Sequence, residues 1–330
     1  MIAPLSWHTA LTTWDMPVPA AVLLALAMLC YGWGVWRARP WPVARTAWFA
    51  AGLAVTAFAV GGSVHVYSDV LFSMHMAQHL LLIAVAPALL VLGRPLTLLR
   101  VNRRFVRAVS HPLVALGLYA AVVAGTHLTP FPQAALTHPV LHGAEEVLYL
   151  VSGYLLLLPV LGDPPVRPPL PPMMGLVVLF LGMVVDTIVG VSLLMTPHEP
   201  FPGYAAAGRD WGPALVEDLH WGGAAMWVGG DILMAALAIV VIARWVRAPD
   251  RGGDLGPWLE AARRSAIGED VGPGADLDDD EEALRAYNAM LARLASGDRV
   301  TRPVPPGARG GSSARPSPTG SRAARPRRRR

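Results

Sequence analysis

Seven apolar runs of roughly 20 residues each constrain the fold of this chain more than any other feature. A helix of about 20 residues crosses the roughly 30 Å hydrocarbon core of a bilayer. The composition agrees, because 54% of the residues are hydrophobic and 15% are charged, whereas soluble domains hold about 25% charged residues. We therefore predict an all-α membrane protein, a bundle of seven transmembrane helices that cover roughly residues 18–36, 46–64, 73–93, 112–129, 139–161, 173–195 and 217–246.

Arginines between these runs indicate the orientation of the bundle. They follow the first, third, fifth and seventh runs, whereas the alternate loops hold almost none, Arg209 being the exception. Arginine-rich loops stay in the cytoplasm. We therefore place the N-terminus outside and the C-terminus in the cytoplasm. The net charge of +4 reflects these loops and the last residues, so it points to membrane topology and not to nucleic acid.

The chain divides into two regions of different composition. Residues 1–247 form the predicted seven-helix domain, and residues 248–330 a predicted cytoplasmic tail, rich in Gly, Pro, Arg and acids and largely disordered. Residues 278–295 differ, since acidic residues precede leucines at helical spacing and predict a short amphipathic helix. The terminal arginines could contact anionic lipid.

Two features inside the runs bear on local structure. Pro87 and Pro159 interrupt the hydrogen bonding of a helix and predict a kink or a loosened turn. Cys30 is the only cysteine, so the chain can form neither an internal disulfide nor a CxxC metal or redox site.

Ionisable side chains from several predicted spans gather in the outer half of the membrane. His75 and His79 are four residues apart at the outer end of the third span, so they point the same way, with Met76 on the same side. The fifth span adds a histidine and two adjacent glutamates, the sixth an aspartate, and the seventh two aspartates and a histidine. The candidate metal ligands are His75, Met76, His79, His142, Glu145, Glu146, Asp186, Asp218, His220 and Asp231.

These side chains need a physical cause, because an unpaired carboxylate or imidazole is costly at membrane depth. Histidine suits copper, zinc, iron or nickel, and a thioether suits Cu(I) in particular. The cluster therefore predicts a metal site or a metal passage. A simpler interpretation is also open: the histidine pair could form interhelical hydrogen bonds, the acids of the fifth span a closed polar network, and the first acids of the seventh span a solvated helix start.

The sequence HMAQHLLLIAVAPALLVLGRPLTLL, from His75 to Leu99, closely resembles the signature of the seven-helix CtaG-type cytochrome c oxidase assembly factors. His142-Gly-Ala-Glu145 resembles the HxxE(H) element of that family. The segment EDLHWGGAAMWVGGD, from Glu217 to Asp231, is similar to its aspartate-containing element with GGxxxW and a Gly-acid pair. Glu146 departs from the pattern, since many relatives carry histidine there.

This resemblance implies an assembly factor of the bacterial plasma membrane, not an enzyme, that binds Cu(I) in the outward-facing cluster and hands it to the catalytic subunit of cytochrome c oxidase. Zinc is the alternative metal. Three other classes stay open: a seven-span zinc hydrolase with His75, His79 and His220 as ligands and Asp186 as base, a membrane haem protein with axial histidines from the third and fifth spans, and an ion transporter that uses the buried acids.

Overall fold

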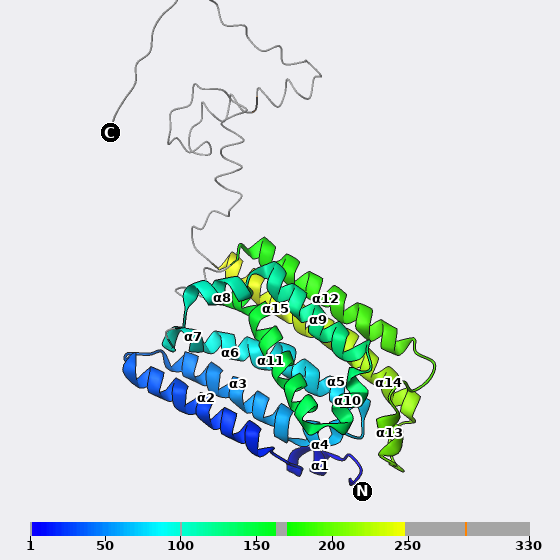
Figure 1. The fold of residues 1–330 in the computed structure, drawn as a ribbon. Helices are drawn as coiled ribbons and strands as arrows, with labels where there is room; N and C mark the ends of the chain where they lie inside the picture. Colours follow the sequence, from blue (N-terminus) through cyan, green and yellow to red (C-terminus); the bar gives the residue numbers. More distant parts are fainter. Residues whose placement is uncertain (1, 100, 163–169, 248–287, 289–330) are drawn as a thin grey trace, which may run out of the picture. The chain divides into compact units, whose positions relative to one another are not determined.

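Helices form all the secondary structure in the part of the chain that the computed structural model describes, residues 2–99, 101–162, 170–247 and 288 (Figure 1). Six stretches are long and apolar enough to cross a membrane. They are α2 (Val18–Arg37), α3 with α4 (Val43–Ser68), α5 through α7 (Phe72–Leu98), α11 (Pro139–Leu161), α12 (Pro172–Leu194) and α14 through α15 (Leu215–Val246). The pair α9 (Pro112–His127) and α10 (Phe131–Thr137), bent by 71°, is a seventh candidate. The all-α prediction is confirmed, with six to seven candidate spans.

Three of these stretches are built from several helical segments. The second stretch contains α3 (Val43–Gly61) and α4 (Ser63–Ser68). The third contains α5 (Phe72–Leu80), the π-helical turn η1 (Leu81–Val85), α6 (Ala86–Gly93) and α7 (Pro95–Leu98). The last contains α14 (Leu215–Ala224), the π-helical turn η2 (Ala225–Gly229) and α15 (Gly230–Val246). The remaining short helices are α1 (Trp7–Thr12), α8 (Arg103–Val109) and α13 (Pro202–Ala206). Each π turn inserts one extra residue per turn and changes the direction of the side chains that follow.

Proline and glycine account for many of the helix boundaries. Proline lies in the first turn of α2, α9, α11 and α12, where its missing N–H costs no helical hydrogen bond. Gly62 separates α3 from α4 with extended backbone, at φ −84° and ψ −171°. This break lets α4 turn and pack against the start of α5.

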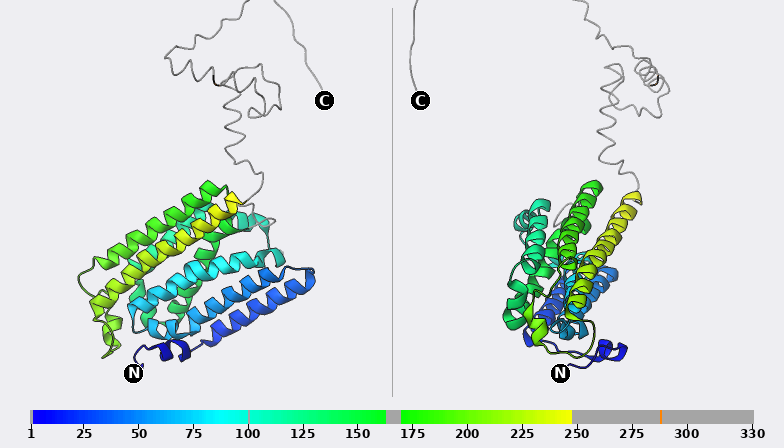
Figure 2. Two further views of the ribbon diagram at one scale, coloured as in Figure 1. Left: turned by 180° about the vertical axis from the view of Figure 1, so that it is seen from behind. Right: turned by 90° about the vertical axis from the view of Figure 1, so that its right-hand side faces the viewer.

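The third stretch lies at the centre of the bundle (Figures 1 and 2). α3 and α11 pack on α6 and η1, while α4 and α14 pack on α5. α12 packs along α9, α14 and α15. The main core joins these helices and includes the fully buried side chains of Tyr119, Tyr149, Leu156 and Leu179. The segment α5–η1 is therefore surrounded by protein, which is where the predicted ligands of the third span lie.

The described helices belong to one compact unit, Met1–Arg251. The predicted tail, residues 248–330, with its amphipathic helix near 278–295 and its terminal arginines, lies outside the described residues apart from Asn288. The division at residue 247 and the orientation of the two termini stay predictions.

Candidate metal centre

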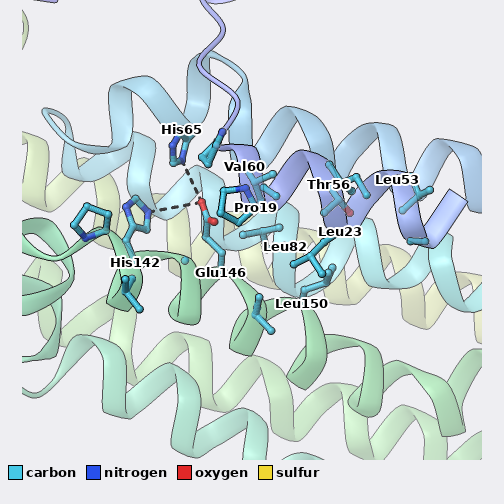
Figure 3. Close-up of a pocket in the computed structure, with 18 of the residues that line it drawn as sticks. Pro19, Leu23, Leu53, Thr56, Val60, His65, Leu82, His142, Glu146 and Leu150 are labelled. Atoms are coloured by element: carbon cyan, nitrogen blue, oxygen red, sulfur yellow. Dashed lines mark hydrogen bonds and ion pairs between the residues drawn. The ribbon is translucent and has the colours of Figure 1, made fainter.

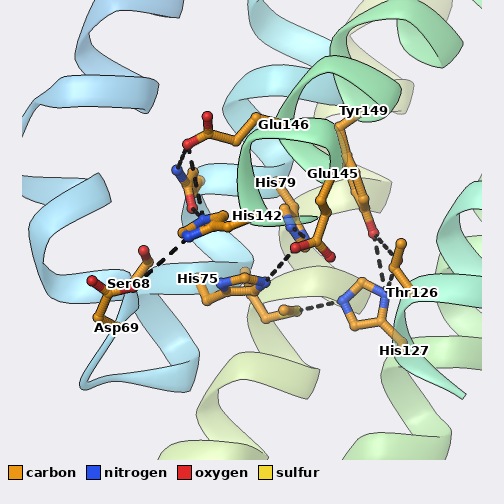
Figure 4. Close-up of polar contacts among 12 residues, drawn as sticks. Ser68, Asp69, His75, His79, Thr126, His127, His142, Glu145, Glu146 and Tyr149 are labelled. Atoms are coloured by element: carbon orange, nitrogen blue, oxygen red, sulfur yellow. Dashed lines mark hydrogen bonds and ion pairs between the residues drawn. The ribbon is translucent and has the colours of Figure 1, made fainter. Parts of the chain in front are cut away.

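α5 and α11 bring two histidines and a glutamate together inside the bundle (Figure 4). His75 and His79 project from α5, and Glu145 projects from α11. One ligand atom from each lies within 4.8 Å of the other two. The Glu145 carboxylate oxygens lie 3.8 Å from His75 Nε2 and 3.5 Å from His79 Nε2. We call this group the inner triad.

The polar atoms of the inner triad lack the partners that burial requires. His75, His79 and Glu145 are 3%, 4% and 0% exposed. His75 Nδ1, both ring nitrogens of His79 and both carboxylate oxygens of Glu145 are buried without a hydrogen-bond partner. A buried polar group left unpaired costs about 1–3 kcal/mol, and a charged group costs more. A cation between the three side chains would bind one nitrogen of each imidazole and the carboxylate, a donor set that transition metals accept.

His127 and Met76 adjoin the inner triad. The rings of His127 and His79 have centroids 5.3 Å apart, and His127 Nε2 lies 3.1 Å from Met76 Sδ. Tyr149 from α11 stacks on His79 with ring centroids 3.8 Å apart, and its hydroxyl lies 3.2 Å from His127 Nδ1. These contacts hold both imidazole rings in place.

A second group consists of His65 from α4 with His142 and Glu146 from α11 (Figure 3). We call it the outer triad. Glu146 Oε1 lies 3.1 Å from His65 Nδ1 and 3.9 Å from His142 Nε2. Gln78 donates from Nε2 to the same oxygen at 2.7 Å and to the carbonyl of Ala59 at 2.9 Å. In contrast to the inner triad, hydrogen bonds thus already join Glu146 to His65 and to Gln78.

The two triads are neighbours, because consecutive glutamates on α11 serve one each. The ring centroid of His142 lies 5.6 Å from that of His75 and 5.4 Å from that of His65. His142 therefore lies between the two groups.

A cavity of about 840 Å³ opens beside the outer triad (Figure 3). Its polar end contains the three side chains of the outer triad and Asp69, whose Oδ1 lies 3.8 Å from His142 Nδ1. The side chain of Asp69 is 59% exposed. Its partial burial nevertheless raises the pKa of its carboxyl group, and the neighbouring His65 opposes that rise. The rest of the lining is mostly apolar and includes Leu23, Leu53, Leu82 and Leu150, whereas no member of the inner triad lines the cavity.

Asp218 supports the site from outside the triads. Its Oδ2 accepts the backbone N–H of Phe72 at 2.7 Å, and its Oδ1 accepts the hydroxyl of Ser73 at 2.5 Å. Arg209 Nη2 lies 3.7 Å from the same carboxylate. Phe72 and Ser73 supply the free backbone and side-chain donors at the start of α5, so Asp218 holds the helix that carries His75 and His79.

The other predicted ligands of the sixth and seventh spans lie outside both triads and make different contacts. Asp186 accepts the hydroxyl of Tyr119 at 2.7 and 2.8 Å. Asp231 Oδ2 accepts from Thr187 at 3.4 Å, while its Oδ1 is buried without a partner. His220 donates from Nε2 to a backbone carbonyl after α12 at 2.9 Å. Of the ten predicted ligands, the structure gathers six in or beside the two triads: His75, Met76, His79, His142, Glu145 and Glu146.

Three residues of the site were not among the predicted ligands. Gln78 lies inside the sequence HMAQH, three residues after His75, which places it next to the ligands on α5. His127 ends the fourth predicted span on the same side of the bundle, a signal that supports its inclusion. His65 follows the end of the second predicted span, and its position depends on the break at Gly62.

One family model matches most of this chain. The model of the family described as cytochrome c oxidase caa3 assembly factor (Caa3_CtaG) matches residues 29–248, which contain both triads. No solved structure matches the chain.

Several mycobacterial proteins are similar to this chain. The uncharacterized proteins Mb0105 of Mycobacterium bovis and MT0111 of Mycobacterium tuberculosis are each 30% identical to it over 312 residues, which cover 86% of this chain and 45% of the relative. The uncharacterized protein ML1998 of Mycobacterium leprae is 26% identical, over 77% of this chain and 40% of its own length. The chain thus spans less than half the length of these curated relatives.

Proposed function

Because the chain belongs to the Caa3_CtaG family of cytochrome c oxidase caa3 assembly factors, we propose that it binds copper and delivers it to the catalytic subunit of the oxidase. The inner triad is the proposed binding site. One observation carries the proposal: three buried side chains, His75, His79 and Glu145, converge from two helices, and five of their polar atoms have no hydrogen-bond partner. Closed polar networks satisfy their own members, so this arrangement favours a bound cation.

Charge balance at the inner triad favours monovalent copper. The triad contains one carboxylate and two imidazoles, and imidazole binds metals in its neutral form. A Cu(I) ion cancels the charge of Glu145, whereas a divalent ion leaves a net positive charge inside the bundle, which is costly at membrane depth. Zinc, which accepts the same donor atoms, is the alternative.

The outer triad extends the proposed site into a route. His142 lies between His75 and His65, with ring centroids 5.6 and 5.4 Å away, so an ion can pass between triads by exchanging one imidazole for the next. The hydrogen bonds between His65, Gln78 and Glu146 would open as the ion arrives. The cavity beside the outer triad gives the ion a way in or out of the bundle.

The proposed orientation places this route on the outer side of the bacterial plasma membrane. The short helices α1, α4 and α13 gather at one end of the bundle, together with the start of α5 (Figure 1). With the N-terminus outside, that end faces the compartment where we expect copper to reach the oxidase. In this proposal the lipid bilayer surrounds the spans, and the terminal arginines contact anionic lipid in the cytoplasmic leaflet.

The zinc hydrolase that the sequence left open draws no support from the positions of its residues. It requires His220 beside His75 and His79, but His220 Nε2 donates to the carbonyl of Thr196. Its proposed base, Asp186, is held by Tyr119.

A deletion strain tests the proposed function. We expect cells without the gene, grown with limited copper, to lose oxidase activity and oxidase-bound copper, and added copper to restore part of both. Wild-type protein should complement the strain, whereas the His75→Ala/His79→Ala variant should not. The His198→Ala variant, which alters an exposed loop histidine, should complement fully. Equal complementation by the double variant and the wild type would refute the proposal.

A further inference from the structure

Met76 and His127 place a thioether sulfur and an imidazole nitrogen side by side next to the inner triad. Met76 Sδ lies 3.1 Å from His127 Nε2, and the two residues are 1% and 3% exposed. His127 Nδ1 lies 2.9 Å from the carbonyl oxygen of Val123, and it also faces the hydroxyls of Thr126 and Tyr149 at 3.1 and 3.2 Å. Nδ1 therefore has a partner in either neutral tautomer, because the carbonyl accepts from an Nδ1–H and a hydroxyl can donate to a bare Nδ1. With the hydrogen on Nε2 the ring donates to the sulfur, and with the hydrogen on Nδ1 the Nε2 lone pair lies beside the sulfur lone pairs.

The tautomer with the hydrogen on Nδ1 is the one that can bind a metal through Nε2, because a histidine ligand commonly donates its other ring N–H to a backbone carbonyl. The carbonyl of Val123 is such a partner, 2.9 Å from Nδ1. In this tautomer the Nε2 lone pair and the thioether sulfur can hold a soft cation together.

Resting on the proposed function, we infer that Met76 and His127 form a soft coordination position beside the inner triad, and that this position makes the site selective for monovalent copper. Thioether sulfur with imidazole suits Cu(I), whereas divalent ions gain little from a thioether. Cu(I) would use the soft position together with the triad. Divalent ions would use the nitrogen and oxygen atoms of the triad alone.

The surrounding protein holds the soft position in place. Met76 adjoins His75 in the chain, and the His127 ring lies 5.3 Å from that of His79. A methionine side chain is normally adaptable. Here Gly222 on α14 lets Met76 pack closely, because a Cβ at residue 222 would lie 3.1 Å from Met76 Cγ. The sulfur is therefore directed at His127 by close packing.

Metal competition with the full-length protein in detergent tests this inference. The probes are Cu(I), its redox-stable analogue Ag(I), and Co(II) as a divalent ion. Met76→Leu keeps a similar volume and removes the sulfur. We expect it to weaken Cu(I) and Ag(I) binding by about tenfold or more, as loss of a supporting group in a metal site does, and to leave Co(II) affinity nearly unchanged. His127→Gln should show the same selective loss.

Met234→Leu is the matched control, because Met234 is equally buried, at 1% exposed, on α15. It should change neither affinity. X-ray absorption of the Cu(I)-loaded wild type provides a readout without any variant and should detect a sulfur ligand.

The outcomes separate this inference from the proposed function. If wild-type protein binds none of the ions, the proposed function fails. If it binds the ions but the sulfur signal is absent, only the soft position is overturned. The same holds if Met76→Leu leaves Cu(I) affinity unchanged, or weakens Cu(I) and Co(II) binding equally.

Discussion

The carboxylate of Asp218 joins α14 to the start of α5, and its removal should loosen the site without removing a ligand. It is 1% exposed, accepts from Phe72 and Ser73, and pairs with Arg209. Asp218→Ala leaves these donors unpaired, and we expect it to lower the free energy of unfolding by about 3 kcal/mol. Thermal unfolding in detergent measures this. The exposed neighbour Glu217→Ala should change little, and equal melting temperatures for the two variants would contradict the role of Asp218.

Individual site residues were predictable where helical spacing alone decides their direction. His75 and His79 share a face because they are four residues apart on one helix, and Glu145 follows His142 by three. The position of His65 depends on how α4 packs against α5, and that of His127 on how α9 packs against α11 and α12, which no local pattern records. Asp218 carries a carboxylate, as a metal ligand would. Only the position of α5 shows that this carboxylate accepts a hydrogen bond from the backbone instead.

The contact between α11 and η1 sets the spacing of the inner triad, and one glycine permits it. A Cβ at Gly153 would overlap the backbone carbonyl of Ile83. We expect Gly153→Ala to displace α11, to lower stability by about 1–3 kcal/mol, and to weaken metal binding, because Glu145 lies on the same helix. Gly143→Ala on α11 is the control, since a Cβ there meets nothing within 4 Å and alanine favours a helix by up to about 1 kcal/mol. Metal titration and thermal unfolding should separate the two variants. Wild-type metal affinity and stability of Gly153→Ala would show that the helices can move apart freely.

Apolar runs predicted the existence of the helices but not their interruptions. Pro87 marks the loosened part of the third span, where the structure places the π turn η1 just before α6. The π turn η2 has no proline near it. The fourth run is shorter than the others in the structure, because α9 ends at His127 and the chain bends by 71° into α10. Leu128, Thr129 and Pro130 end that helix, and the proline was the only local signal.

The orientation of the bundle rests on arginine placement and can be tested with single cysteines. In a Cys30→Ala background, Ala207→Cys lies after α13 and Ala108→Cys lies in α8, and both positions are exposed. We expect a membrane-impermeant maleimide to label Ala207→Cys in intact cells and Ala108→Cys only after lysis, because arginines surround the second site. The reverse pattern would place the metal site on the cytoplasmic side and contradict delivery from outside.

Copper-induced stabilisation of the purified protein tests most directly whether the inner triad holds a cation. Copper that binds only the folded state stabilises it by about 2.7 kcal/mol when free Cu(I) exceeds the dissociation constant 100-fold. We predict this stabilisation for the wild type and for the control Glu217→Gln. The Glu145→Gln variant should lose this stabilisation, because the neutral amide cannot balance the charge of the ion. Without metal, the variant should unfold at a higher temperature than the wild type, because it no longer buries an unpaired carboxylate. Equal stabilisation of Glu145→Gln and wild type by Cu(I) would contradict metal binding at this triad.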